Sequence, residues 1–327
     1  MRQKPYVKIK EGNTMKKLVA FLLMVFLLMT AGSAFGTEKV KIGYLRVVPS
    51  LPTFVAAEKG FFSQEGLEVE LIPFQSGTAI VDALVAGRID ANCMSAITQH
   101  WFAEQHVPDK FKIFLVYGAD SNVDNTFVVV VRKDSPLQDL KDLKGKKVGT
   151  FPGANQVVLA RAIIRTQMDP EKVIFTEIPP PNLIPVLAAG QIDAYFSPEP
   201  FGMMAVFQGM GRYLMKSPCT LLGLKKGIVG GAFSFSAKFL DEKPELAKKV
   251  KAAIEKGVGY IKTNEQESRG YLSKYTPLPP PVATRIPFEK WIKIKDLDKK
   301  APQRYFDLLY KEGAYQKDLD TTELYYE

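Results

Sequence analysis

The chain has 327 residues, of which 46% are hydrophobic and 24% are charged, and its formal net charge is +9. Residues 1–36 hold six Lys or Arg and one Glu, so the remaining chain carries +4 with both signs interspersed, and such a balance indicates no nucleic-acid partner. The chain has two cysteines, Cys93 and Cys219, which are too few for a disulfide scaffold. They can form one disulfide bridge or remain two buried free thiols, and the second state is favoured.

The first element in chain order is a predicted signal peptide over residues 1–36. A basic start at Lys16 and Lys17 precedes an apolar run over residues 18–29 that is short for a bilayer span. Small residues end the segment, so we expect cleavage near Gly36 and a soluble, periplasmic protein. A membrane anchor is the weaker alternative because no apolar run of comparable length follows.

An internal repeat organises the rest of the chain. Residues 84–91 read LVAGRIDA and residues 187–194 read LAAGQIDA, with six of eight positions identical. A strand pattern that ends in Gly43 or Gly149 precedes the aspartate of each copy, at distances of 47 and 44 residues. The repetition predicts two similar lobes.

Within each lobe the pattern alternates strands and helices, which indicates a parallel sheet. The first lobe is predicted to contain strand 40–45, a helix from Ser50 to Lys59, strand 67–74, helix 77–86 and strand 89–94. The second is predicted to contain strand 147–150, helix 155–166, strand 172–178, a helix between Asn182 and Gly190, and strand 192–196. Ser50, Ser76 and Asn182 are the expected N-caps.

The predicted fold class is α/β, with two similar lobes that are each a mostly parallel sheet flanked by helices, joined by a hinge that the chain crosses twice. Apolar runs at 126–132 and 232–236 are assigned to the crossings. Lobe 1 is then 37–122 plus 232–327, and lobe 2 is 123–231. The C-terminal part of lobe 1 is predicted to hold surface helices and one loop, at residues 244–260, 265–275 and 302–310 and at 277–281 respectively.

Parallel sheets of this kind bind ligands outside the carboxyl ends of their strands. Three such ends are expected in each lobe, and the helix N-termini beside them favour an anion. The residues predicted to bind a ligand are Arg46, Ser50, Gln75, Ser76, Gly77, Thr78, Asn92 and Ser95 in lobe 1, and Phe151, Gly153, Asn155, Gln156, Asn182, Phe196 and Glu199 in lobe 2.

These residues also have purely structural interpretations. The serines can cap helices, and Phe151 and Phe196 can be core residues. Arg46 is the only cation in the six loops and Glu199 the only acid. Two roles stay open for Glu199, which lies between two prolines: binding a ligand amine, or bridging to the opposite lobe on closure.

Several motifs in combination resemble a known family. They are Ala57–Phe62, Glu65–Glu70, Leu84–Asp90, Leu140–Gly149 and Gly190–Ala194. Together they are similar to the nitrate/sulfonate/taurine and NMT1/THI5-like substrate-binding proteins, over most of residues 40–240. The resemblance implies the type II periplasmic-binding fold, closure of two lobes around a ligand, and delivery to an ABC permease with its ATPase. Ligands in the family include alkanesulfonates, taurine, nitrate, bicarbonate and thiamine pyrimidine precursors.

Catalysis is not predicted. Enzymes of the THI5 branch carry a cysteine-rich signature that this chain lacks. His100 and His106 are six residues apart, so they do not share a helix face as a zinc helix requires, and both are assigned to solvent-facing or packing positions. Asp90 and Asp193 lie at strand starts, away from the expected ligand edge, where a turn and a cap explain them. No catalytic residue, metal ligand or cofactor is therefore assigned.

The sequence favours a periplasmic solute-binding component of an ABC importer that captures a small organic anion resembling a sulfonate, taurine or nitrate, and we expect a monomer. Two alternatives stay open: a binding protein for an uncharged pyrimidine or aromatic ligand, and a sensory module that presents its ligand to a receptor. A DNA-binding regulator is disfavoured because a signal peptide, not a helix-turn-helix, precedes the lobes.

Overall fold

The computed structural model describes residues 39–327 except 119–126, 153, 225–228 and 288. The predicted signal peptide lies outside this part of the chain. Residues 40–327 form one compact unit. None of the helices in the described ranges combines the length and the apolar character that crossing a bilayer would take.

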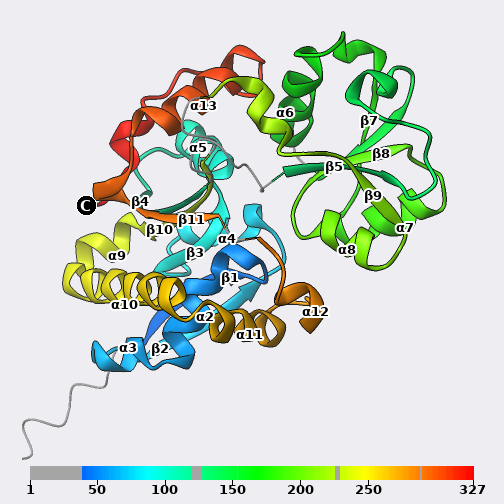
Figure 1. Ribbon diagram of the computed structural model, residues 1–327. Coiled ribbons are helices and arrows are strands. Elements are labelled where there is room, and N and C mark those ends of the chain that lie inside the picture. Colours follow the sequence, from blue (N-terminus) through cyan, green and yellow to red (C-terminus); the bar gives the residue numbers. More distant parts are fainter. Residues whose placement is uncertain (1–38, 119–126, 153, 225–228, 288) are drawn as a thin grey trace, which may run out of the picture. The chain divides into compact units, whose positions relative to one another are not determined.

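The first sheet contains six strands, and its parallel part agrees with the sequence pattern. The strands are β1 (Val40–Leu45), β2 (Val69–Phe74), β3 (Ala91–Ala96), β4 (Phe111–Gly118), β10 (Val229–Ser236) and β11 (Lys290–Lys293). Their order is β11-β4-β10-β3-β1-β2 (Figure 1). β1 pairs in parallel with β2 and β3, whereas β10 runs antiparallel to both of its neighbours.

The second sheet repeats this plan with five strands. They are β5 (Phe127–Arg132), β6 (Lys147–Thr150), β7 (Ile174–Glu177), β8 (Ala194–Pro198) and β9 (Gly211–Lys216). In the order β7-β6-β8-β5-β9, the first three strands are parallel and β5 runs antiparallel to both neighbours. The two-sheet α/β fold is therefore confirmed, and most strands of each sheet run in one direction, with antiparallel strands added to both.

The antiparallel strands have a common cause. β5 and β10 are the strands by which the chain enters each sheet after leaving the other one, so neither is the second strand of a βαβ unit, which would make it parallel. The runs assigned to the hinge crossings are thus sheet strands, and the connections at 119–126 and 225–228 lie outside the described residues. The lobe boundaries stay a prediction; β10 begins at Val229, so it spans the predicted boundary between 231 and 232.

Helices cover both faces of the sheets. On the first sheet they are α2 (Leu51–Glu58), α3 (Phe61–Gln64), α4 (Gly77–Val85), α5 (Ile97–His106), α9 (Ala237–Glu242), α10 (Pro244–Thr263), α11 (Glu265–Tyr275), α12 (Pro280–Ala283) and α13 (Lys300–Lys311). On the second they are α6 (Ala154–Arg165), α7 (Leu183–Ala188) and α8 (Phe201–Phe207). The loop predicted at 277–281 is therefore wrong at its end, where Pro280 and Pro281 begin α12. Proline is tolerated there because it lies in the first turn of the helix.

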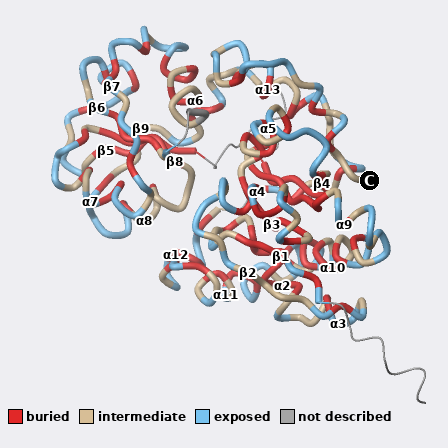
Figure 2. Tube along the Cα trace, turned by 180° about the vertical axis from the view of Figure 1, so that it is seen from behind, coloured by how far each residue is buried: buried red, intermediate tan, exposed pale blue. Residues whose placement is uncertain are grey.

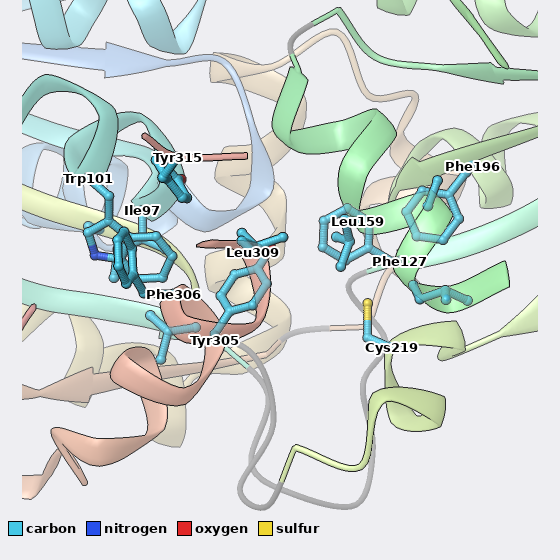
Figure 3. Close-up of a cluster of buried hydrophobic side chains, with 14 of the residues drawn as sticks. Ile97, Trp101, Phe127, Leu159, Phe196, Cys219, Tyr305, Phe306, Leu309 and Tyr315 are labelled. Atoms are coloured by element: carbon cyan, nitrogen blue, oxygen red, sulfur yellow. The ribbon is translucent and has the colours of Figure 1, made fainter. Parts of the chain in front are cut away.

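The core lies between the sheets and these helices, and Figure 2 shows the strands among the most buried segments. One hydrophobic cluster joins α2 and α10 to β1, and another joins α4, α5 and α13 to the opposite face. In the second cluster, Trp101 on α5 has its ring centroid 5.5 Å from those of both Tyr305 and Phe306 (Figure 3). This cluster continues into Phe196 of the second sheet and Leu159 of α6, a helix that covers that sheet.

The repeated octapeptide makes the same joint in both sheets. Asp90 Oδ2 accepts a hydrogen bond from the Lys41 amide at 2.8 Å, and Asp193 Oδ2 accepts one from the Lys147 amide at the same distance. Each bond fixes the start of the central parallel strand to the strand that pairs with it. Asp90 and Asp193 are therefore structural residues at the amino ends of the strands, as the sequence indicates.

The strand glycines complete this joint. A Cβ atom at Gly43 would lie 2.7 Å from the side chain of Ile89, and one at Gly149 would lie 3.0 Å from that of Ile192. Both isoleucines belong to the repeat, so the repeat places an apolar side chain directly on each strand. This close approach explains why the two features recur together.

We predict that Asp90→Ala and Asp193→Ala each lower the free energy of unfolding by about 1–2 kcal/mol, because a strand-end amide loses its acceptor. The effects should add, since the two joints lie in different sheets. Urea unfolding followed by circular dichroism measures both. Asp82→Ala, at an exposed position of α4, is the matched control. Loss of stability in the control equal to that in the variants would contradict the role of the joint.

Candidate functional site

The carboxyl ends of the parallel strands lead into helices in both sheets, as predicted. In the first sheet β1, β2 and β3 are followed by α2, α4 and α5; in the second, β6, β7 and β8 are followed by α6, α7 and α8. We call these two rows of strand ends the ligand edges. Amide groups in the first turn of a helix have no intrahelical acceptor, so each edge carries hydrogen-bond donors.

Four predicted residues are exposed on the ligand edge of the first sheet: Arg46, Gln75, Ser76 and Thr78. Ser76 caps α4, because its Oγ accepts from the Ala79 amide at 3.2 Å. Arg46 forms no ion pair with any residue that the structure describes. This edge therefore combines an available positive charge with short polar side chains.

Ser50 differs from its predicted role as an N-cap. Its backbone is already helical, and its side chain makes no cap bond to α2. It is fully buried, and its Oγ lies 2.8 Å from the Leu45 carbonyl oxygen and 3.3 Å from that of Cys93. The hydroxyl thus ties the ends of β1 and β3 together beneath the edge instead of facing a ligand.

The two cysteines are buried, and neither joins a disulfide. Cys93 and Cys219 belong to different hydrophobic clusters. Burial raises the pKa of the Cys93 thiol to about 12, so it stays protonated. Buried thiols are thus the state that the structure shows.

Asn92 and Ser95 lie inside the first lobe, in a polar network that also contains His100 and Ser234. All four side chains are fully buried. Nδ1 of His100 lies 3.2 Å from the Ala96 carbonyl oxygen, which can only accept, so Nε2 is left to accept from the Ser234 hydroxyl at 2.8 Å. The Asn92 amide nitrogen donates to Ser95 Oγ at 2.8 Å. The network lies in the interior next to the ligand edge and packs beneath its exposed residues.

Ser234 is missing from the residues singled out in the sequence, which also did not predict the polar partners of His100. Ser234 lies 134 residues from His100 along the chain. A pairing at that distance leaves no local pattern. Assignment of His100 to a packing position is consistent with its burial, and its bonds to polar partners are what burial of an imidazole requires.

On the second sheet, Phe151 is half-buried and its ring contacts Phe201 edge to face, with centroids 5.1 Å apart. Gln156 is half-buried, and its Oε1 is buried with no partner among the described residues. Asn182 is exposed and makes no cap bond to α7, contrary to the predicted cap. Gly153 lies outside the described residues, as does the side chain of Asn155.

Phe196 is a core residue and does not face the edge. Only 3% of it is exposed, and its ring stacks on Phe127 with centroids 5.5 Å apart. Of the two interpretations that the sequence leaves open for Phe151 and Phe196, packing therefore holds for Phe196. Phe151 keeps a partly exposed ring at the edge.

Glu199 is bound within its own lobe. Its Oε1 accepts from the Tyr213 hydroxyl at 2.7 Å and its Oε2 from the Met203 amide at 2.9 Å. Burial raises the pKa of this carboxyl, and the two hydrogen bonds oppose the rise. The carboxylate thus anchors the first turn of α8 to β9. Neither a ligand amine nor the opposite lobe is needed to explain its position.

A cavity of about 400 Å³ lies elsewhere, between α10, β11 and the last residues. It is lined by lysines and glutamates, some of them already paired, as Lys293 is with Glu255 at 2.8 Å. It contains none of the strand-end residues. In the described part of the chain, no three His, Cys, Asp or Glu side chains are grouped to hold a metal ion. The ligand edges therefore remain the candidate site.

Glu199→Gln should remove a pH dependence of stability. Because the pKa of Glu199 is raised on folding, its favourable contribution is complete below the ordinary value of 4.5 and declines as the pH rises through the folded pKa. Wild type should therefore lose stability relative to the variant as the pH increases from about 4 to about 8. Urea unfolding of both proteins across this pH range measures the difference in their free energies of unfolding. A difference that does not change with pH would contradict the prediction.

His100→Gln should remove a pH dependence of stability whose sign is opposite to that of Glu199. Burial lowers the pKa of His100 from 6.5 to about 4, so its contribution is complete above 6.5 and declines as the pH falls toward 4. We expect wild type to lose about 2 kcal/mol relative to the variant between about pH 7 and pH 5. The exposed His106→Gln variant is the control, and it should retain the loss of stability that His100 causes between pH 7 and pH 5.

Relatives and solved structures support the fold. The chain is 28% identical to the bicarbonate transport ATP-binding protein CmpC of Synechocystis sp. over 205 residues, which are 56% of this chain and 30% of the relative. The chain thus spans less than a third of that relative. It is 24% identical to a candidate aliphatic sulfonates-binding protein of Bacillus subtilis over 325 residues, which cover 94% of each.

Among solved structures, the periplasmic aliphatic sulphonate binding protein SsuA from Escherichia coli superimposes with a TM-score of 0.73 at 20% identity, covering 89% of this chain and 92% of that one. The likeness confirms the periplasmic-binding fold that the motifs imply. A family model described as the NMT1-like family matches residues 33–274. Since the match covers most of the sequence, the chain belongs to the NMT1-like family.

Proposed function

We propose that this protein is the solute-binding component of an ABC importer and captures a small organic anion, such as a sulfonate, taurine or nitrate, between its two lobes. The observation that carries the proposal is the charge balance of the ligand edges. Arg46 is exposed and unpaired in the described chain, whereas the one acid of the strand-end loops, Glu199, is held by Tyr213 and Met203. An anion would meet donors at the first edge, where none of the exposed residues predicted to bind a ligand is an acid.

The second edge suits the organic part of such a ligand. Phe151 and Phe201 present partly exposed rings at the ends of β6 and β8. Ligand sites commonly combine apolar walls with a few polar groups that fix orientation. A sulfonate or carboxylate at the first edge would leave an alkyl or aryl portion to contact these rings.

Partners and location follow from the same proposal. The relatives carry names of binding and transport proteins, so we propose a membrane permease and its ATPase as partners and binding without catalysis. Residues 1–36 would act as a signal peptide, cleaved near Gly36, and the protein would work in the periplasm as a monomer. The lobes would be residues 37–122 with 232–327 and residues 123–231.

The proposed function is tested by titration calorimetry of the purified protein with alkanesulfonates, taurine and nitrate. At least one should bind, and Arg46→Gln should weaken its binding by about tenfold, as expected for one charge-assisted hydrogen bond. Arg88→Gln, at the amino end of β3, is the matched control and should leave affinity unchanged. Binding of an uncharged pyrimidine, with no anion bound, would reject the proposal.

A further inference from the structure

Gln99, in the first turn of α5, has a side-chain orientation that the hydrogen bonds determine. Its Oε1 accepts from the Ala96 amide at 3.1 Å. An amide N–H can only donate, so the oxygen must face Ala96 and the nitrogen must face away. Nε2 has no acceptor among the described residues. The two hydrogens of this nitrogen are thus available on the ligand edge, where Gln99 is half-buried.

The carboxamide lies against Gly77, the first residue of α4. A Cβ atom at Gly77 would be 2.5 Å from Nε2 and closer still to Oε1, and the three atoms nearest to it all belong to Gln99. Only a residue without a side chain leaves room for the amide here. Gln99 therefore joins the two strand ends that flank the end of β1, because α4 follows β2 and α5 follows β3.

We propose that Gln99 is a specificity-determining residue of this edge, and that its Nε2 donates to an oxygen of the ligand's anionic group. The inference rests on the proposed function and names a contact within it. The groups around Nε2 are also donors: the amides of Gly77 and Thr78 lie in the first turn of α4, where no intrahelical acceptor exists. The exposed Thr78 hydroxyl can supply another.

This arrangement selects a class of ligand group. A fully ionised oxyanion, such as a sulfonate, has only acceptor oxygens and can use every donor at this position. An amine or a protonated acid would direct a hydrogen at Nε2, and the amide cannot turn to accept it without giving up the bond to Ala96. The edge should therefore discriminate against ligands whose head group carries hydrogens.

Gln99→Glu is the sharpest test because it preserves shape. A carboxylate can still accept from the Ala96 amide and lie on Gly77, but it places an acceptor with negative charge where Nε2 donates. Gln99→Met keeps the length and removes the donor. We expect Gln99→Met to weaken the binding of an alkanesulfonate by about 10- to 100-fold in calorimetry and Gln99→Glu to weaken it further.

Two controls isolate the contact. Gln167→Glu makes the same charge change at an exposed position beyond the carboxyl end of α6, and its affinity should equal that of wild type. Thermal unfolding of the Gln99 variants within a few degrees of wild type shows that the fold is intact.

Gly77→Ala displaces the amide and should weaken binding as Gln99→Met does, with no additional loss of affinity in the double variant.

The outcomes separate this inference from the proposed function. Binding of the alkanesulfonate to wild type, with unchanged affinity in Gln99→Met, overturns the role of Gln99 and leaves the proposed function standing. Binding of no sulfonate, taurine or nitrate to wild type overturns both. Weakening in Gln99→Met together with an unchanged affinity in Gln167→Glu supports the contact.

Discussion

The carboxylate-to-amide bond at the start of each central parallel strand is the constraint on which the rest of both sheets depends. Asp90 and Asp193 bind the amides of Lys41 and Lys147, and the isoleucine before each aspartate rests on a strand glycine. Together they set the register between two strands in each sheet, β1 with β3 and β6 with β8, at their amino ends. Because register determines where every strand stops, this joint at one side of the sheet positions the helix N-termini at the other.

Local pattern predicts much of this structure and little of its tertiary contacts. The sequence predicts β1, β6 and α11 with the bounds observed, since each begins and ends at a local signal. Ser50, by contrast, has the residue type and position of a helix cap but bonds to strand carbonyls, one of them 43 residues away. The antiparallel direction of β5 and β10 also has no local signal, because it depends on the chain entering each sheet from the other one.

The residues of the candidate site also differ in how far the sequence predicts them. Exposed residues near strand ends, such as Arg46 and Ser76, are recognisable from sequence because loop position alone brings them to the edge. Phe196 and Asn92 lie further back in strands that are buried on both faces, so their side chains are in the interior. Glu199 is at the edge, but both of its carboxylate oxygens accept hydrogen bonds from partners on β9 and α8, and Gln99 acts across two helices. Partners of this kind become visible only once the sheets are assembled.

The order of strands in the first sheet has a consequence for how the protein is made. This sheet takes β1 to β4 from residues 40–118 and β10 and β11 from residues 229–293, with the whole second sheet between them in sequence. β10 lies between β3 and β4, so the sheet cannot close until the later strands exist. Contacts so distant in sequence form slowly. The first sheet of a nascent chain therefore stays incomplete until most of the chain has been synthesised, a delay that would suit the export proposed for this protein.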